Sequence, residues 1–187
     1  MNSDKVRMFM KLAGQAYSKV PVKGDARLRE LGAKLLLSEV LEYVIKGLGV
    51  VPSFNGVEIT DANTLGYKSS SELNPLEMLD GLADTAYTMY WNALAFGMPI
   101  EQAFELVCDN NLEKFVELPN WTRGSCNLES ADWHCDREIT WPSEVTQVIA
   151  LEVEGKFFAV GKDQSGKVRK PSSYASVDLT ALVANCQ

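Results

Sequence analysis

Two apolar stretches, each carrying a closely spaced pair of acids, constrain this chain of 187 residues more than any other feature. In the first stretch, a helix is predicted from Asp25 to Gly47 or Gly49, with apolar residues in nearly every direction around it. A helix of that kind is normally buried. Glu39 and Glu42 are three residues apart on it, so they share one face. Buried carboxylates cost several kcal/mol each unless their charge is compensated.

A second predicted helix repeats this arrangement. It covers about residues 74–96, with asparagine as the N-cap and proline at the first helical position. Glu77, Asp80 and Asp84 lie at offsets of three and seven, so they form one acidic stripe on this helix. The opposite face is apolar, so this helix also combines carboxylates with a surface suited to burial.

The four acids of the two pairs indicate a metal site. If the helices pack antiparallel, Glu39, Glu42, Glu77 and Asp80 converge, and their carboxylates repel one another unless cations neutralise them. Hard oxygen ligands suit Mg²⁺ or Mn²⁺. The alternative is that each pair faces water or meets a lysine. A di-iron centre needs Glu-x-x-His on two helices, and the single histidine, His134, lies in an irregular segment, which argues against that chemistry.

The remaining segments predict two regions along the chain. Helices are expected over about residues 4–17 and 99–115, and a short hairpin around Asn55-Gly56. Residues 119–143 are rich in Trp, Ser, Asn and Cys and show no period. Strands are expected within residues 145–160, with a hairpin turn at Glu154-Gly155. We therefore predict a helical core over residues 1–118 and a C-terminal extension over residues 119–187.

Charge and cysteine content restrict the class of partner and the compartment. The net charge is −7 and the isoelectric point is about 4.8, which argues against a nucleic-acid surface. The first eleven residues lack the apolar core of a signal peptide, and the apolar stretches carry carboxylates. We expect a cytoplasmic protein that does not bind membranes. Cys126, His134 and Cys135 offer zinc ligands, but at a spacing that fits no common zinc motif, so incidental thiols are the alternative.

The ordered set of motifs resembles a known family, the all-α nucleoside triphosphate pyrophosphohydrolases of the MazG-like and phosphoribosyl-ATP pyrophosphohydrolase-like type. The mark of that family is EExxE on one helix followed by ExxD on the next. Residues 38–42 read SEVLE, residues 77–80 read EMLD, and residues 110–114 read NNLEK, similar to a Ser-Asn-Met-x-Lys stretch of the family. The similarity covers roughly residues 5–115, and the tail from Gly166 to Leu179 also resembles members of the family.

The resemblance implies an all-α fold, with a four-helix core that forms bundles by dimerisation and a C-terminal extension containing a β-hairpin. It implies Mg²⁺-dependent hydrolysis of a (deoxy)nucleoside triphosphate to the monophosphate and pyrophosphate, with Mn²⁺ as a possible substitute. A homodimer or homotetramer is expected. Phosphoribosyl-ATP hydrolysis and a non-catalytic nucleotide- or metal-binding regulator of the same fold are the alternatives.

The resemblance also assigns roles to the acids. Glu39, Glu42, Glu77 and Asp80 match the metal ligands, and Glu39 or Glu42 is expected to orient or deprotonate the attacking water. Ser38 stands where the family pattern has another acid, so a second or third metal is in doubt. Ser38 and Asp84 are expected to support the ligands from outside the coordination sphere.

Five further residues are predicted to bind the phosphates. Lys34 lies one turn before Ser38 and so projects near the acids. Asn111 and Lys114 are candidates because of their positions in the family motif. Two lysines of the tail are expected to close over the phosphates. A solvated lysine is the alternative for Lys34 and for the tail. The five predicted phosphate ligands are Lys34, Asn111, Lys114, Lys167 and Lys170.

Overall fold

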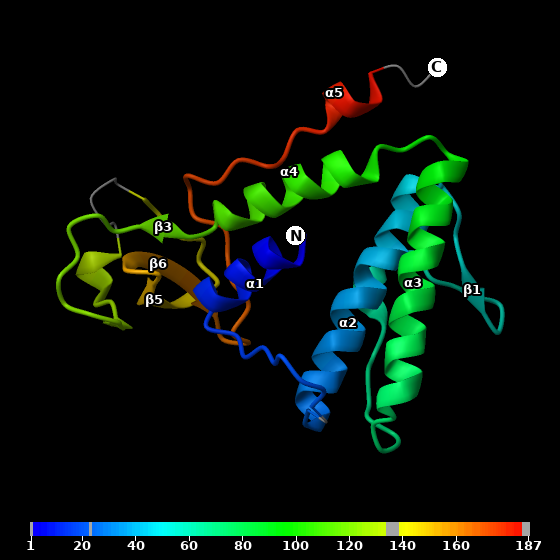
Figure 1. Cartoon of the computed structure of the whole chain (residues 1–187), viewed down its shortest axis with the longest axis horizontal. Coiled ribbons are helices and arrows are strands. Elements are labelled where there is room, and N and C mark those ends of the chain that lie inside the picture. The colour runs from blue at the N-terminus through cyan, green and yellow to red at the C-terminus, as the bar shows by residue number, and fades with distance from the viewer. Residues whose placement is uncertain (1, 23, 134–138, 185–187) are drawn as a thin grey trace. The chain divides into compact units, whose positions relative to one another are not determined.

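The computed structural model describes residues 2–22, 24–133 and 139–184, and it divides the chain into two compact units (Figure 1). Residues 19–84 form the first, here called the helical unit. Residues 1–18 and 85–187 form the second, here called the sheet unit, so the helical unit is inserted between two parts of the sheet unit. The division falls inside a helix, after Asp84. The boundary that we predicted between residues 118 and 119 lies within the sheet unit and stays a prediction.

The first helix of the helical unit, α2, begins where the sequence predicts, with Asp25 as its N-cap. The Asp25 side chain accepts a hydrogen bond from the Leu28 amide at 2.7 Å. The predicted hairpin at Asn55-Gly56 is confirmed, and both of its turn residues have positive φ. The elements are α2 (Ala26–Glu42), the π-helical turn η1 (Tyr43–Gly47), β1 (Ser53–Phe54), β2 (Val57–Glu58), η2 (Ala62–Thr64) and the first part of α3 (Pro75–Ala95).

Helices α2 and α3 start at the same end of the helical unit. The Ser69 amide donates to the Glu30 carboxylate at 2.8 Å, and the Arg29 guanidinium donates to the Ser71 carbonyl at 2.7 Å. The segment that leads into α3 is therefore held against the first turns of α2. Figure 1 shows the two helices running in the same direction, so the antiparallel packing that we considered from the sequence is not what the structure contains.

The sheet unit contains a four-stranded antiparallel sheet in the order β3-β6-β5-β4. Its centre is the hairpin predicted at Glu154-Gly155, which pairs Val153 with Lys156. The elements are α1 (Asn2–Leu12), the rest of α3, α4 (Ile100–Leu112), β3 (Val116–Glu117), β4 (Cys126–Asn127), η3 (Ser130–Asp132), β5 (Val145–Val153), β6 (Lys156–Asp163) and α5 (Thr180–Val183).

The predicted all-α class with a four-helix core is therefore wrong. The fold is mixed: 43% of the described residues are in helices and 15% in strands, and the strands form two antiparallel sheets in this part of the chain. The reason lies in the partners of α1, which packs against α4 and against β5 of the sheet. Leu12, Ala13 and Phe115 form one buried cluster with Val160 of the sheet.

The opposite side of the sheet is covered by the Trp-rich segment. A second buried cluster contains Val148, Ala150 and Ala159, with three tryptophans packed against it. Each indole N–H donates to a backbone carbonyl, at distances of 2.7 to 3.1 Å. Trp141 lies so close to Gly161 that a Cβ at that position would be 2.3 Å from the ring. Residues 119–133 and 139–143 thus complete the sheet core, a role that the sequence did not indicate.

Burial separates the two units sharply. No residue of α2 or η1 is buried, and Ala93 is the only buried residue of α3. The expectation that α2 is a buried helix is not met within one chain, since Leu35, Leu36 and Leu37 are each at least 41% exposed. In the described part of the chain, no helix has the length and apolar character needed to cross a membrane.

Candidate functional site

The predicted metal ligands lie at opposite ends of their helices. Glu42 is the last residue of α2, and Glu77 lies in the first turn of α3. At a rise of about 1.5 Å per residue, Glu42 is about 24 Å along its helix from the start, and Asp80 is about 8 Å along its own. Because both helices start at the same end of the unit, the two acidic pairs are offset along the helix axes.

One chain consequently does not assemble the predicted four-carboxylate site. Among the described residues, no group of three or more His, Cys, Asp or Glu side chains is placed to hold one metal ion. The donor chemistry suits Mg²⁺, because all four predicted ligands are carboxylates. The structure places these carboxylates in two separate pairs.

The four acids and Asp84 are accessible to solvent. Glu39, Glu77, Asp80 and Asp84 are exposed, and Glu42 is half-buried. These carboxylates therefore carry little of the desolvation cost that we predicted for them. Glu42 is the only one of the five with an ion pair among the described residues, to Lys46 at 3.3 Å on the next helical turn.

A cavity of about 270 Å³ opens beside Glu42. It is lined by Glu42, Ile45, Lys46, Thr60, Asp61 and Ala62. Hydrogen bonds from the backbone and side chain of Asn63 lower the pKa of the Asp61 carboxyl below its ordinary value, so this acid is ionised at neutral pH. The sequence analysis did not single out Asp61. The signal available for it was local, an aspartate two residues before an asparagine in a turn-prone segment.

Ser38 and Lys34 lie on α2 without direct contacts to the acids. The Ser38 hydroxyl donates to the Leu35 carbonyl at 3.1 Å, so it bonds back to its own helix. Lys34 is exposed. The support predicted from Ser38 and the phosphate contact predicted from Lys34 stay predictions.

The sheet unit brings together three of the four other predicted phosphate ligands. Lys114 Nζ donates to Asn111 Oδ1 at 2.5 Å and lies 5.8 Å from the centre of the Tyr174 ring. Lys170 Nζ lies 4.7 Å from the same ring centre. Asn111 and Lys114 flank the C-terminal end of α4, and Lys170 belongs to the tail. The sequence analysis missed Tyr174, the residue that both lysines share.

Hydrogen bonds fix the tail beside α4, as Figure 1 shows. The Tyr174 hydroxyl pairs with Asn110 Oδ1, and Asn110 Nδ2 donates to the Ala175 carbonyl at 2.7 Å. Further back, the Ser172 amide donates to the Thr140 carbonyl at 2.9 Å. The position of Lys170 next to Tyr174 is thus set by contacts on both sides of it along the chain.

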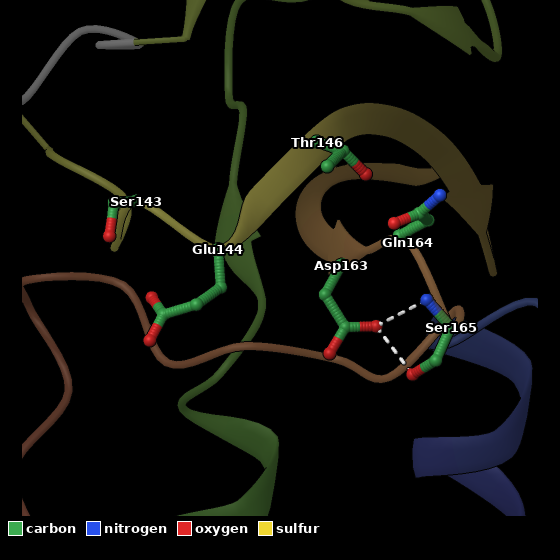
Figure 2. Close-up of a pocket in the computed structure, with 6 residues that line it drawn as sticks. All are labelled: Ser143, Glu144, Thr146, Asp163, Gln164 and Ser165. Carbon is green, nitrogen blue, oxygen red and sulfur yellow. Dashed lines mark hydrogen bonds between the residues drawn. The ribbon is translucent and has the colours of Figure 1, made fainter.

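Lys167 lies on a different part of the tail, and its amide bonds to Asp163. Asp163 lines a cavity of about 670 Å³ (Figure 2). This cavity is lined by Ser143, Glu144, Thr146, Asp163, Gln164 and Ser165. The Lys167 side chain is exposed, and its amide donates to Asp163 Oδ1 at 3.0 Å. Among the described residues, the Tyr174 ring contacts Lys114 and Lys170, whereas Lys167 bonds to Asp163, so the predicted role of Lys167 in phosphate binding stays a prediction.

Asp163 organises the turn at this cavity. The Ser165 hydroxyl, the amides of Lys167 and Ser165, and Arg169 lower the pKa of the Asp163 carboxyl to about 2. One oxygen accepts the bonds of the turn, two of which are drawn in Figure 2, and the other accepts from Arg169 at 2.9 Å. Both oxygens are engaged, so we interpret this large open cavity as the outer surface of a structural turn.

The thiol and imidazole groups considered for zinc are only partly covered by the structure. Cys126 is half-buried in β4. His134 and Cys135 lie outside the described residues, so the structure does not test that alternative.

Comparisons of the chain with protein-family models, with curated proteins and with solved structures found no match.

Proposed function

We propose that the chain hydrolyses a (deoxy)nucleoside triphosphate to the monophosphate and pyrophosphate in a Mg²⁺-dependent reaction. The observation that carries the proposal is the state of the acids in the two motifs. Glu39, Glu77 and Asp80 are exposed and form no ion pair among the described residues. Carboxylates on apolar helices that make no structural contacts are available to a cationic ligand and its bound phosphates.

We propose that the site is completed by a second copy of the chain. Within one copy the two acidic pairs are offset, so a two-fold partner running the other way brings Glu39 and Glu42 of one copy beside Glu77 and Asp80 of the other. The same association covers the leucines of α2, which are exposed in the single chain. A homodimer, or a tetramer made of two such dimers, accounts for both observations.

The chemistry requires little of the side chains beyond orientation. A bound Mg²⁺ ion neutralises charge on the polyphosphate. Glu39 or Glu42 orients the attacking water and accepts its proton, the water oxygen bonds to phosphorus, and pyrophosphate leaves with the electron pair of the broken P–O bond. Asp84 supports the ligands on α3. Lys34, Asn111, Lys114, Lys167 and Lys170 are the proposed phosphate contacts.

A nucleotide panel tests the proposal. The full chain is incubated with the four dNTPs, the four NTPs and phosphoribosyl-ATP, each with Mg²⁺ or Mn²⁺, and pyrophosphate is measured. We expect pyrophosphate from at least one nucleoside triphosphate and none when EDTA is present. If only phosphoribosyl-ATP is hydrolysed, the chain is a phosphoribosyl-ATP pyrophosphohydrolase. Metal-dependent thermal stabilisation without turnover of any compound would favour a nucleotide-binding regulator.

A further inference from the structure

We propose that Lys114 and Lys170 form an anion-binding site in the sheet unit, and that the Tyr174 ring positions both ammonium groups for a polyphosphate. The inference rests on the proposed function only for the choice of polyphosphate as the ligand. The site itself follows from contacts between α4 and the tail, which are some 60 residues apart in the sequence.

Lys114 and Lys170 share one aromatic ring, that of Tyr174. Lys114 Nζ and Lys170 Nζ lie 5.8 and 4.7 Å from the centre of the Tyr174 ring. Both distances are within the range of cation–π attraction, which is about 6 Å. Each ammonium group is therefore attracted to the same aromatic side chain. The electron-rich face of the ring supplies that attraction.

The Tyr174 ring is rigidly placed. The Tyr174 hydroxyl pairs with Asn110 Oδ1, and the Tyr174 amide donates to the Pro171 carbonyl at 3.0 Å. Pro171 is buried. Burial raises the pKa of the Tyr174 phenol, so the hydroxyl remains a hydrogen-bond donor at neutral pH. The ring is therefore held at its hydroxyl end and at its backbone.

Charged neighbours determine whether the two lysines can bind a solute. The neighbouring acid, Glu113, accepts a hydrogen bond from Asn110 Nδ2 at 3.3 Å. Lys170 is exposed and forms no ion pair with a carboxylate anywhere in residues 2–22, 24–133 and 139–184. Its charge therefore remains available to a solute, whereas Lys5, Lys11 and Lys156 are each paired with an acid.

These observations identify the class of ligand. Lysine binds phosphate as a point charge, and two ammonium groups around one ring suit an anion that carries more than one phosphoryl group. The face of an aromatic ring repels an anion, so the ligand binds the ammonium groups and Tyr174 acts as a positioning residue. Asn111, which accepts from Lys114, adds an amide donor at the same place.

Isothermal titration calorimetry of the full chain with inorganic tripolyphosphate, without metal, tests this site. We expect wild-type chain to bind, and Lys170→Gln and Tyr174→Leu each to weaken binding by about tenfold. Tyr174→Phe keeps the ring and loses only the hydroxyl contact, so we expect a loss of about threefold or less. Lys156→Gln, which removes a lysine paired with Glu117 on the same unit, is the matched control and should bind as wild type.

Several outcomes would overturn the inference. If the wild-type chain does not bind tripolyphosphate, the proposed site does not exist. If wild type and Lys170→Gln bind equally well, Lys170 does not contribute to the site. Tyr174→Phe as weak as Tyr174→Leu would show that the hydroxyl, and not the ring, matters. Circular dichroism checks the fold of each variant, and Lys170→Gln decides the matter if Tyr174→Leu does not fold. A chain that binds tripolyphosphate in this pattern but hydrolyses no nucleotide would refute the proposed function and leave this site intact.

Discussion

The sheet unit and the helical unit differ in how far their apolar residues are buried. In the sheet unit, both faces of a four-stranded sheet are covered, one by tryptophans and the other by α1 and Phe115. Among the described residues of the helical unit (19–22 and 24–84), Ala62 is the only one that is buried. The sheet unit therefore has a hydrophobic core within one chain, and the helical unit does not.

This difference indicates which unit is built for contact with other molecules. An exposed leucine is common, but a run of three on one helix is not. Contiguous exposed apolar surface of this kind marks an interaction site. The acids of the proposed metal site lie on the same helices, so we propose that association and ligand binding are coupled in the helical unit.

The largest expected effect is on catalysis, which we assign to acids of the helical unit. We expect Glu42→Gln and Asp80→Asn to lower Mg²⁺-dependent pyrophosphate release by about 10²–10⁴-fold, because they remove a water-orienting group and a metal ligand. Glu72→Gln is the matched control, since Glu72 is an exposed acid of the same unit that lies outside both motifs. Unchanged turnover in both site variants would refute the assignment of these acids.

The next largest effect is on association. Leu35 is 56% exposed in the single chain, so Leu35→Lys should leave the monomer folded while placing a charge in the proposed interface. We expect the dissociation constant of the dimer to rise by about 100-fold, measured by analytical ultracentrifugation. Val20→Lys, at a loop position that is 68% exposed, should leave the dimer intact. A wild-type chain that is monomeric at high concentration would contradict the proposed partner.

A smaller effect tests the packing of the sheet unit. Gly161→Ala places a methyl group 2.3 Å from the Trp141 ring, so the free energy of unfolding should fall by about 1–3 kcal/mol in urea titrations followed by tryptophan fluorescence. Gly32→Ala on α2 meets no atom within 4 Å and should raise the free energy of unfolding by up to about 1 kcal/mol. If Gly161→Ala is neutral, Trp141 does not pack on β6 as described.

The smallest effect is a pH dependence at Asp163. The pKa of its carboxyl is about 2 in the folded chain and 3.8 ordinarily, so the folded state favours the ionised form. The resulting stabilisation is complete above pH 3.8 and is lost as the pH falls from 3.8 to 2. We expect the melting temperature to fall over this interval, and to fall less in Asp163→Asn. Glu152→Gln, an exposed position on β5, should follow the wild type.

Local signals predicted the elements of the fold well. The Asp25 N-cap and Pro75 at the start of α3 are where the sequence placed them. The first helix is shorter than predicted, because Gly14 takes a left-handed conformation with φ of 63° and ends the helix after Leu12 although the apolar period continues to Tyr17. Strands β3 and β4 were missed, since two residues are too few to show a period.

These local patterns do not predict how the elements are arranged in space. Helical periodicity gives the face of α2 that carries Glu39 and Glu42, but not the direction of the helix beside it. That direction is set by residues 48–74, which return the chain to the start of α2 before α3 begins. The link between Asn110 and Tyr174 joins residues 64 apart, so no local motif indicates it.

The insertion of one unit into the other has a consequence for the order of events during synthesis. The Ala13 carbonyl at the end of α1 accepts a hydrogen bond from Lys162 Nζ at 2.6 Å, across 149 residues of chain. At about 5–20 residues per second, a ribosome needs roughly 7–30 s to make that stretch. During this interval the leucines of α2 have already emerged while α1 still lacks the strands on which it packs. The helical unit is therefore the first of the two units whose whole sequence is available to chaperones, or to another nascent copy on the same messenger.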